Sequence, residues 1–125
     1  MSWESTQPYY ARINQQVQAR LGSGASAELL LWSANFAEIE ALQHADAWDA
    51  LGDKLGTAAR GLAAAGAEHL VLCTNTMHCL ADAITEASGL PLLHIAEPTG
   101  HALRARGVRR VGLLGTRFTM EQRFY

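Results

Sequence analysis

The chain has 125 residues, enough for one domain with a hydrophobic core. Its hydrophobic fraction of 49% and charged fraction of 18% are typical of globular proteins. A net charge of -2, without a Lys/Arg cluster, argues against nucleic acid as a partner. No apolar run approaches the roughly 20 residues that span a bilayer, so we expect no membrane partner.

The cysteines and the N-terminus bear on the cellular compartment. Cys73 and Cys79 are too close in sequence for a disulfide between them to stabilise a fold, so we interpret both as reduced thiols. The opening residues "MSWEST" lack the basic region and apolar stretch of a secretion signal. We therefore expect a cytoplasmic protein.

Apolar residues recur at helical spacing in several segments. Tyr10, Ile13, Val17 and Leu21 predict a first helix that ends at Gly22. A second stripe predicts a helix over 48–66, and further patterns predict helices over 77–89, 97–107 and 116–125, each glycine-terminated except the last. The residues of the second stripe are Trp48, Leu51, Leu55, Ala58 and Leu62.

Short apolar runs between these helices predict four strands, at 28–33, 69–73, 92–95 and 110–115. Strands that alternate with helices indicate a parallel sheet covered on both faces. The predicted fold is therefore a three-layer α/β/α domain, Rossmann-like or flavodoxin-like, with a mostly parallel sheet of about four strands. No linker or internal repeat is visible, so residues 1–125 form one predicted domain.

Polar and reactive side chains follow the predicted strands, at the sheet edge where open α/β folds bind ligands. Thiol, hydroxyl and amide groups lie there beside the N-termini of the helices that follow the strands. Helix N-terminal amides and hydroxyls can hydrogen-bond a small carboxylate. The residues at this edge are Ser33, Asn35, Phe36, Cys73, Thr74, Asn75, Thr76, His94, Thr116 and Thr119.

Cys73 is the most distinctive of these residues. A thiol between a strand end and a helix N-terminus should have a lowered pKa, which would make thiolate available near neutral pH. The alternative is that Cys73 is a small buried apolar residue. The adjacent Thr-Asn-Thr favours a functional role.

Metal and dinucleotide sites are less well supported. Cys73, His78, Cys79 and His94 could form a ligand set, but Cys-x5-Cys is not a usual zinc spacing. We expect no metal, and we expect Cys79 to pack. The glycines around 112–115 do not complete a dinucleotide fingerprint.

Several motifs together resemble the aspartate/glutamate racemase family, and most closely its broad-specificity amino-acid racemase branch. They are "MSWEST", "YY", "IN", "NFAEIE", "LCTNTMH", "PLLHIAEPTG" and "VGLLGTRFTMEQRFY". The resemblance covers the whole chain. It implies a cofactor-independent enzyme with two similar α/β domains, in which the substrate lies between the domains and each domain supplies one cysteine.

The resemblance assigns roles to individual residues. Cys73 occupies the position of the first catalytic cysteine, in a Cys-Thr-Asn-Thr motif that places Thr74, Asn75 and Thr76 against the substrate. Substrate contacts are also implied at four positions outside this motif, two of them in a Gly-Thr-x-x-Thr loop that closes the site. They are Met1, Gln43, Thr116 and Thr119.

Two parts of the family pattern are missing. The second cysteine lies in a Gly-Cys-Thr-Glu motif that this sequence lacks, and the Gly-rich strand that normally precedes "MSWEST" is also absent. The chain therefore resembles most of an N-terminal domain, an incomplete half of a two-domain racemase. Cys79 cannot replace the second cysteine, because it shares a helix with the residues that follow Cys73.

The leading interpretation is a racemase for aspartate, glutamate or a broader set of amino acids, with Cys73 as one of two acid–base groups. We expect the isolated 125-residue chain to be inactive and the full-length protein to be a homodimer. Hydantoin racemisation, maleate isomerisation and malonate decarboxylation would use the same cysteine position. The alternative is a non-catalytic module, or pseudoenzyme fragment, that binds an amino acid or carboxylate.

Overall fold

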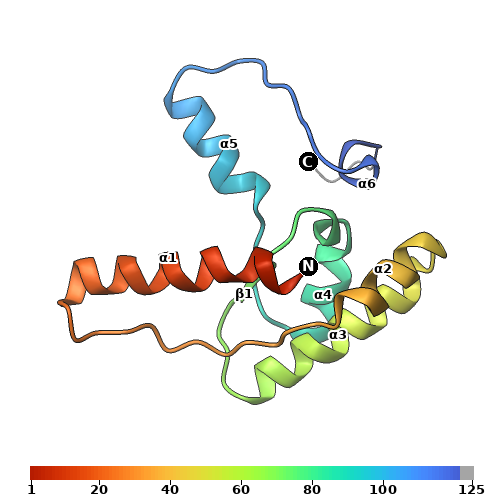
Figure 1. Ribbon diagram of the computed structural model, residues 1–125, viewed down its shortest axis with the longest axis horizontal. Helices are drawn as coiled ribbons and strands as arrows, with labels where there is room; N and C mark the ends of the chain where they lie inside the picture. Colours follow the sequence, from red (N-terminus) through yellow and green to blue (C-terminus); the bar gives the residue numbers. More distant parts are fainter. Residues whose placement is uncertain (122–125) are drawn as a thin grey trace.

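The computed structural model describes residues 1–121, so the last four residues of the predicted helix over 116–125 lie outside the described part. Helices account for most of the described structure, with one small sheet (Figure 1). The elements in chain order are α1 (Trp3–Leu21), α2 (Phe36–His44), α3 (Trp48–Ala64), β1 (Leu70–Val71), the 3₁₀ helix η1 (Thr76–Leu80), α4 (Ala81–Ser88), β2 (Leu92–Leu93), α5 (Ala96–Ala105) and α6 (Arg117–Glu121).

The predicted helices are present, and glycines mark their ends as expected. Gly22 follows α1, and Gly89 follows α4 in the left-handed conformation with a φ of 69°. That conformation suits glycine because in other residues the Cβ crowds the residue's own backbone there. Helix α2 was not among the helices predicted from the sequence. Its N-cap residue is Asn35, whose side chain accepts a hydrogen bond from the Ala37 N–H.

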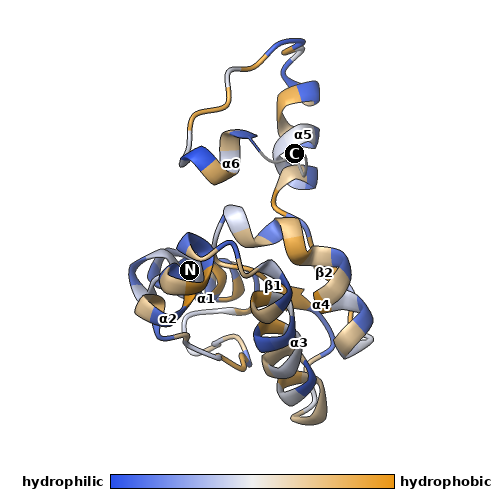
Figure 2. Ribbon diagram, turned by 90° about the vertical axis from the view of Figure 1, so that its right-hand side faces the viewer, coloured by the Kyte–Doolittle hydropathy of each residue, from blue (hydrophilic) through white to orange (hydrophobic). Residues whose placement is uncertain are grey.

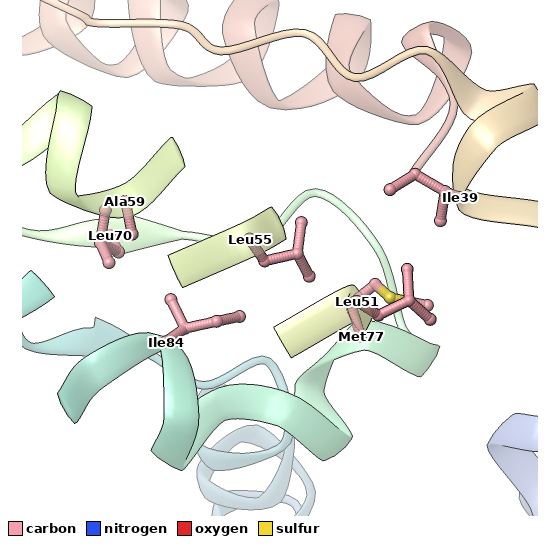
Figure 3. Packing of buried hydrophobic residues seen from close by; sticks show 7 residues of the cluster. All are labelled: Ile39, Leu51, Leu55, Ala59, Leu70, Met77 and Ile84. Carbon is pink, nitrogen blue, oxygen red and sulfur yellow. The ribbon is translucent and has the colours of Figure 1, made fainter. Parts of the chain in front are cut away.

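The core lies between α3, η1 and α4, with one residue each from α2 and β1 (Figure 3). Two members of the predicted stripe on α3, Leu51 and Leu55, are buried there, and Trp48 and Leu62 pack against the core from its margin. Each buried Leu, Ile or Met side chain contributes about 1.5–3 kcal/mol by leaving water. The full core is Ile39, Leu51, Leu55, Ala59, Leu70, Met77 and Ile84.

The sheet is smaller than predicted. β1 and β2 run parallel, with Leu70 opposite Leu92 and Val71 opposite Leu93. The segments 28–33 and 110–115 are not strands, so the prediction of four strands is wrong for the described residues. A β-strand needs a neighbouring strand about 4.8 Å away to which its backbone can hydrogen-bond. Within residues 1–121, neither segment forms backbone hydrogen bonds to another extended segment.

The apolar side chains of these two segments are consequently exposed. Leu31 is 62% exposed and Leu114 is 92% exposed, although both lie in runs that suggested buried strands. The 28–33 segment runs back alongside α1, as Figure 1 shows, and the Asn14 side chain of α1 accepts a hydrogen bond from the Ala27 N–H just before it.

The C-terminal part of the described chain reaches away from the rest and then returns. α5 and the segment that follows it project from the body formed by α1–α4 (Figure 2). α6 comes back to η1, where the hydroxyls of Thr119 and Thr76 lie 3.0 Å apart. Phe118 anchors α6, since its ring contacts Trp48 and His44 edge-on at centroid distances of 5.7 and 6.4 Å. Among residues 1–121, no helix combines the length and apolar character needed to cross a membrane.

Candidate active site

An open pocket of about 610 Å³ lies between the start of α1, helix α2, the loop after β1 and the start of α6. The residues to which the racemase resemblance assigns a role all line it, although they come from four separate stretches of the chain. The lining residues are Met1, Ser5, Tyr9, Phe36, Glu40, Gln43, His44, Cys73, Thr74, Asn75, Thr76, Met77, Gly115, Thr116, Arg117, Phe118 and Thr119.

The first turn of α1 holds the Cys73 loop in place. The Ser5 hydroxyl donates a hydrogen bond of 2.6 Å to the Cys73 carbonyl oxygen, and the Met1 amino group donates one of 3.2 Å to the Thr74 hydroxyl. The Thr6 side chain, in the same turn, acts by hydrogen bonding to lower the pKa of the Cys73 thiol. Cys73 therefore lies against the N-terminus of α1 as well as before η1.

The pKa of Cys73 differs from the sequence prediction. Burial raises the pKa of this half-buried thiol above its usual value, while the hydrogen bond from Thr6 and the nearby Met1 amino group act in the opposite direction. The expectation of a lowered pKa is therefore wrong. Desolvation disfavours the charged thiolate, and this effect outweighs the donors that the loop presents.

A cluster of three hydroxyls joins the Cys-Thr-Asn-Thr loop to α6. The Thr76 hydroxyl lies 3.0 Å from that of Thr119 and 3.4 Å from that of Thr116, and the last two are 3.2 Å apart. Thr76 and Thr119 are buried, and Thr116 is exposed. A hydroxyl both donates and accepts hydrogen bonds. Each of the three can therefore hydrogen-bond a neighbouring hydroxyl and still reorient towards a ligand.

Asn75 and Gln43 line the pocket in different ways. Asn75 is exposed, and its backbone carbonyl accepts hydrogen bonds from the backbone N–H and the ring Nδ1 of His78. Gln43 is half-buried on α2 and faces the same pocket. The pocket thus offers amide groups from two elements that are distant in sequence.

Sequence reasoning missed several lining residues that share helical faces with predicted ones. Glu40 and His44 lie on the same face of α2 as Gln43 and the predicted Phe36, and Ser5 and Tyr9 follow Met1 at intervals of four residues. Residues spaced by four lie one above the other on a helix. This spacing was the signal that could have revealed them. Two further lining residues, Arg117 and Phe118, lie between the predicted Thr116 and Thr119.

Three of the polar residues expected at the sheet edge do not line this pocket. Ser33 is exposed, Asn35 caps α2 and donates to Glu38, and the His94 ring packs against the His78 ring with centroids 4.5 Å apart. Cys79 is half-buried, and burial raises the pKa of its thiol. In the described range 1–121, no three His, Cys, Asp or Glu side chains form a group that could hold a metal ion.

Comparison with known proteins assigns the chain to a family. The family model for Asp/Glu/hydantoin racemases matches residues 1–125. The chain belongs to this family. The fold also matches the crystal structure of a "putative Asp/Glu Racemase" from Yersinia pestis, with a TM-score of 0.93 and 54% sequence identity.

This match covers 99% of the present chain but only 54% of the Yersinia pestis chain. The chain therefore spans about half the length of that racemase-family relative. The family resemblance inferred from the motifs is confirmed at the level of the Asp/Glu/hydantoin racemase family.

Proposed function

We propose that the pocket is one half of an amino-acid racemase site, in which Cys73 exchanges a proton with the substrate α-carbon. The observation that carries this proposal is that the 73–76 segment, Gln43, Thr116 and Thr119 gather around one pocket. Membership of the racemase family agrees with it. The substrate class is aspartate, glutamate or a broader set of α-amino acids.

The chemistry follows from the groups available. In one direction the Cys73 thiolate removes the α-proton, which forms a thiol and leaves a carbanion that the neighbouring carboxylate group delocalises. In the other direction the Cys73 thiol returns a proton to the same face and becomes a thiolate. Hydroxyl and amide donors of the pocket hold the substrate carboxylate as charge accumulates.

The raised pKa of Cys73 favours the proton-donating role at neutral pH. A racemase that uses two thiols needs one of them protonated at the start of each half-reaction. The Gly-Cys-Thr-Glu motif of the second cysteine is absent from these 125 residues. We therefore expect exchange without inversion, because one group serves only one face of the α-carbon.

Exchange of the α-proton in deuterated water, followed by NMR over L- and D-amino acids, tests this function. Above pH 9, where more of Cys73 is thiolate, the 125-residue chain should exchange one enantiomer of at least one amino acid. Cys73→Ser should abolish exchange. Cys79→Ser is the matched control and should retain it, because Cys79 does not line the pocket. Equal exchange by wild type and Cys73→Ser would refute the role of Cys73.

A second candidate is an amino-acid-binding module without proton transfer. The raised pKa of Cys73 favours it, since a thiol that stays protonated at neutral pH does not abstract protons. NMR titration with L- and D-aspartate distinguishes the two. Shifts at Thr74–Thr76 without α-proton exchange at any pH would support the binding module.

A further inference from the structure

His78 occupies an unusual position behind the candidate site. It is only 1% exposed, and both of its ring nitrogens contact backbone groups of other residues. Nδ1 lies 3.1 Å from the carbonyl oxygen of Asn75, in the pocket loop. Nε2 lies 3.2 Å from the backbone nitrogen of Ile95, the N-cap residue of α5. The ring therefore connects two segments that are separated by the whole of α4.

These two partners determine the protonation of the ring. A backbone N–H can only donate, so Nε2 must be the unprotonated acceptor for Ile95. A carbonyl oxygen can only accept, so Nδ1 must carry the hydrogen that reaches Asn75. Only the neutral Nδ1–H tautomer satisfies both contacts, and the partners of a histidine ring select its tautomer in this way.

The bond to Asn75 fixes the orientation of the peptide unit at the centre of the loop. The Asn75 carbonyl accepts from the backbone N–H of His78 at 3.1 Å and also from its ring. Both lone pairs of that oxygen are then engaged. The peptide between Asn75 and Thr76 cannot rotate without breaking both bonds, and Thr76 carries the hydroxyl that reaches α6.

His94 supports the same arrangement from the other side. Its ring packs edge-on against that of His78, at an interplanar angle of 64°, and its Nδ1 accepts a hydrogen bond of 3.2 Å from the Ala96 N–H. Both rings therefore bond the backbone at the start of α5. The contact between them limits how far the His78 ring can tilt away from Ile95.

We propose that His78 is a positioning residue: as the Nδ1–H tautomer, it locks the pocket loop at Asn75 to the start of α5 at Ile95. The loop then presents its amide and hydroxyl groups in one arrangement, so that a ligand does not have to order them on binding. The consequence for amino-acid binding rests on the proposed function, whereas the lock itself does not.

The tautomer can be measured without any ligand. Long-range ¹H–¹⁵N NMR of the ¹⁵N-histidine-labelled chain at neutral pH separates protonated from unprotonated ring nitrogens. His78→Asn identifies the His78 signals by their disappearance. The expected result is a protonated Nδ1 and an unprotonated Nε2 at His78. A ring protonated at Nε2, or one that interconverts between tautomers, would overturn the proposal.

Two variants separate the two ends of the lock. His78→Gln places an amide near the Nε2 position, where its oxygen can accept from Ile95 but no donor reaches Asn75. His78→Asn keeps a donor near the Nδ1 position and loses the acceptor for Ile95. Both should weaken the binding of L-aspartate, the probe used, by about five- to tenfold, as expected for one lost hydrogen bond.

Each result has a defined meaning. Both variants should keep the wild-type circular dichroism spectrum under the binding conditions, so that weaker binding reports the loop and not global unfolding. Wild-type affinity in both folded variants would overturn the positioning role. If wild type binds no amino acid, the proposed function fails, and the tautomer measurement alone decides whether the lock exists.

Discussion

The hydroxyl oxygens of Thr76 and Thr119 lie 3.0 Å apart, which joins the loop after Cys73 to helix α6 by a buried hydrogen bond. The two residues are 43 positions apart in sequence. Between them the chain leaves the body of the molecule through α5 and returns, as Figures 1 and 2 show. This bond and the Phe118 contacts hold α6 over the pocket.

Replacement of Thr119 by Val should destabilise the chain by about 1–2 kcal/mol, because the buried Thr76 hydroxyl loses its nearer partner. The free energy of urea-induced unfolding measures the effect. Thr119→Ser keeps the hydroxyl and should recover most of the loss. If Val and Ser variants were equally stable, the hydrogen bond would contribute nothing measurable.

The Cys73 thiol should alkylate with a pH profile centred above 9, because burial raises its pKa. The measurement is the rate of reaction with iodoacetamide against pH, in a Cys79→Ala background so that only one thiol reacts. Thr6→Val should move the profile to still higher pH by removing a hydrogen bond that lowers the pKa. Thr6→Ser is the control, and an unchanged profile in Thr6→Val would contradict the role of that hydroxyl.

Stability should depend on pH through His78. Burial lowers the pKa of His78 below its ordinary value of 6.5, the neighbouring His94 acts in the same direction, and hydrogen bonds to the backbone at Asn75 and Thr74 oppose the shift. The unfolded chain therefore binds a proton that the folded chain excludes. The free energy of unfolding should be greatest above pH 6.5 and should fall as the pH drops towards the lowered folded-state pKa.

Urea unfolding between about pH 5 and 8, the range in which histidine titrates, measures this dependence. His78→Gln removes the titrating group and should flatten the fall in stability below pH 6.5. A slope in this variant equal to that of wild type would assign the pH dependence to other groups.

The packing of α3 against α4 depends on a glycine. A Cβ on Gly56 would lie 2.9 Å from the Ala87 Cβ, so Gly56→Ala should destabilise the chain by about 1–3 kcal/mol through overpacking. Gly61→Ala, in the same helix, is the matched control, because nothing lies within 4 Å of the added Cβ. That variant should be more stable by about 0.5–1 kcal/mol. Chemical denaturation of both variants tests the pair, and a stable Gly56→Ala would contradict the close approach.

Much of the candidate site was predictable from sequence because its residues carry local signals. The Cys-Thr-Asn-Thr motif, the end of the 36–44 segment and the Gly-Thr-x-x-Thr loop all line one pocket, as expected from their positions. The roles of these residues remain predictions. The residues that reasoning missed, Ser5 and Glu40 among them, are ordinary polar positions on helices and become part of the site only when α1 and α2 dock.

The sequence by itself determined the positions of most helices, their glycine ends, the buried stripe on α3 and the racemase motifs. Helical spacing and capping act within a few residues, so local sequence encodes them. Only the tertiary structure decided which extended segments pair, that burial raises the pKa of Cys73, and that His78 bonds Asn75 and Ile95 together. Strand pairing, desolvation and hydrogen bonds between distant segments all depend on which parts of the chain meet, and no local pattern records that.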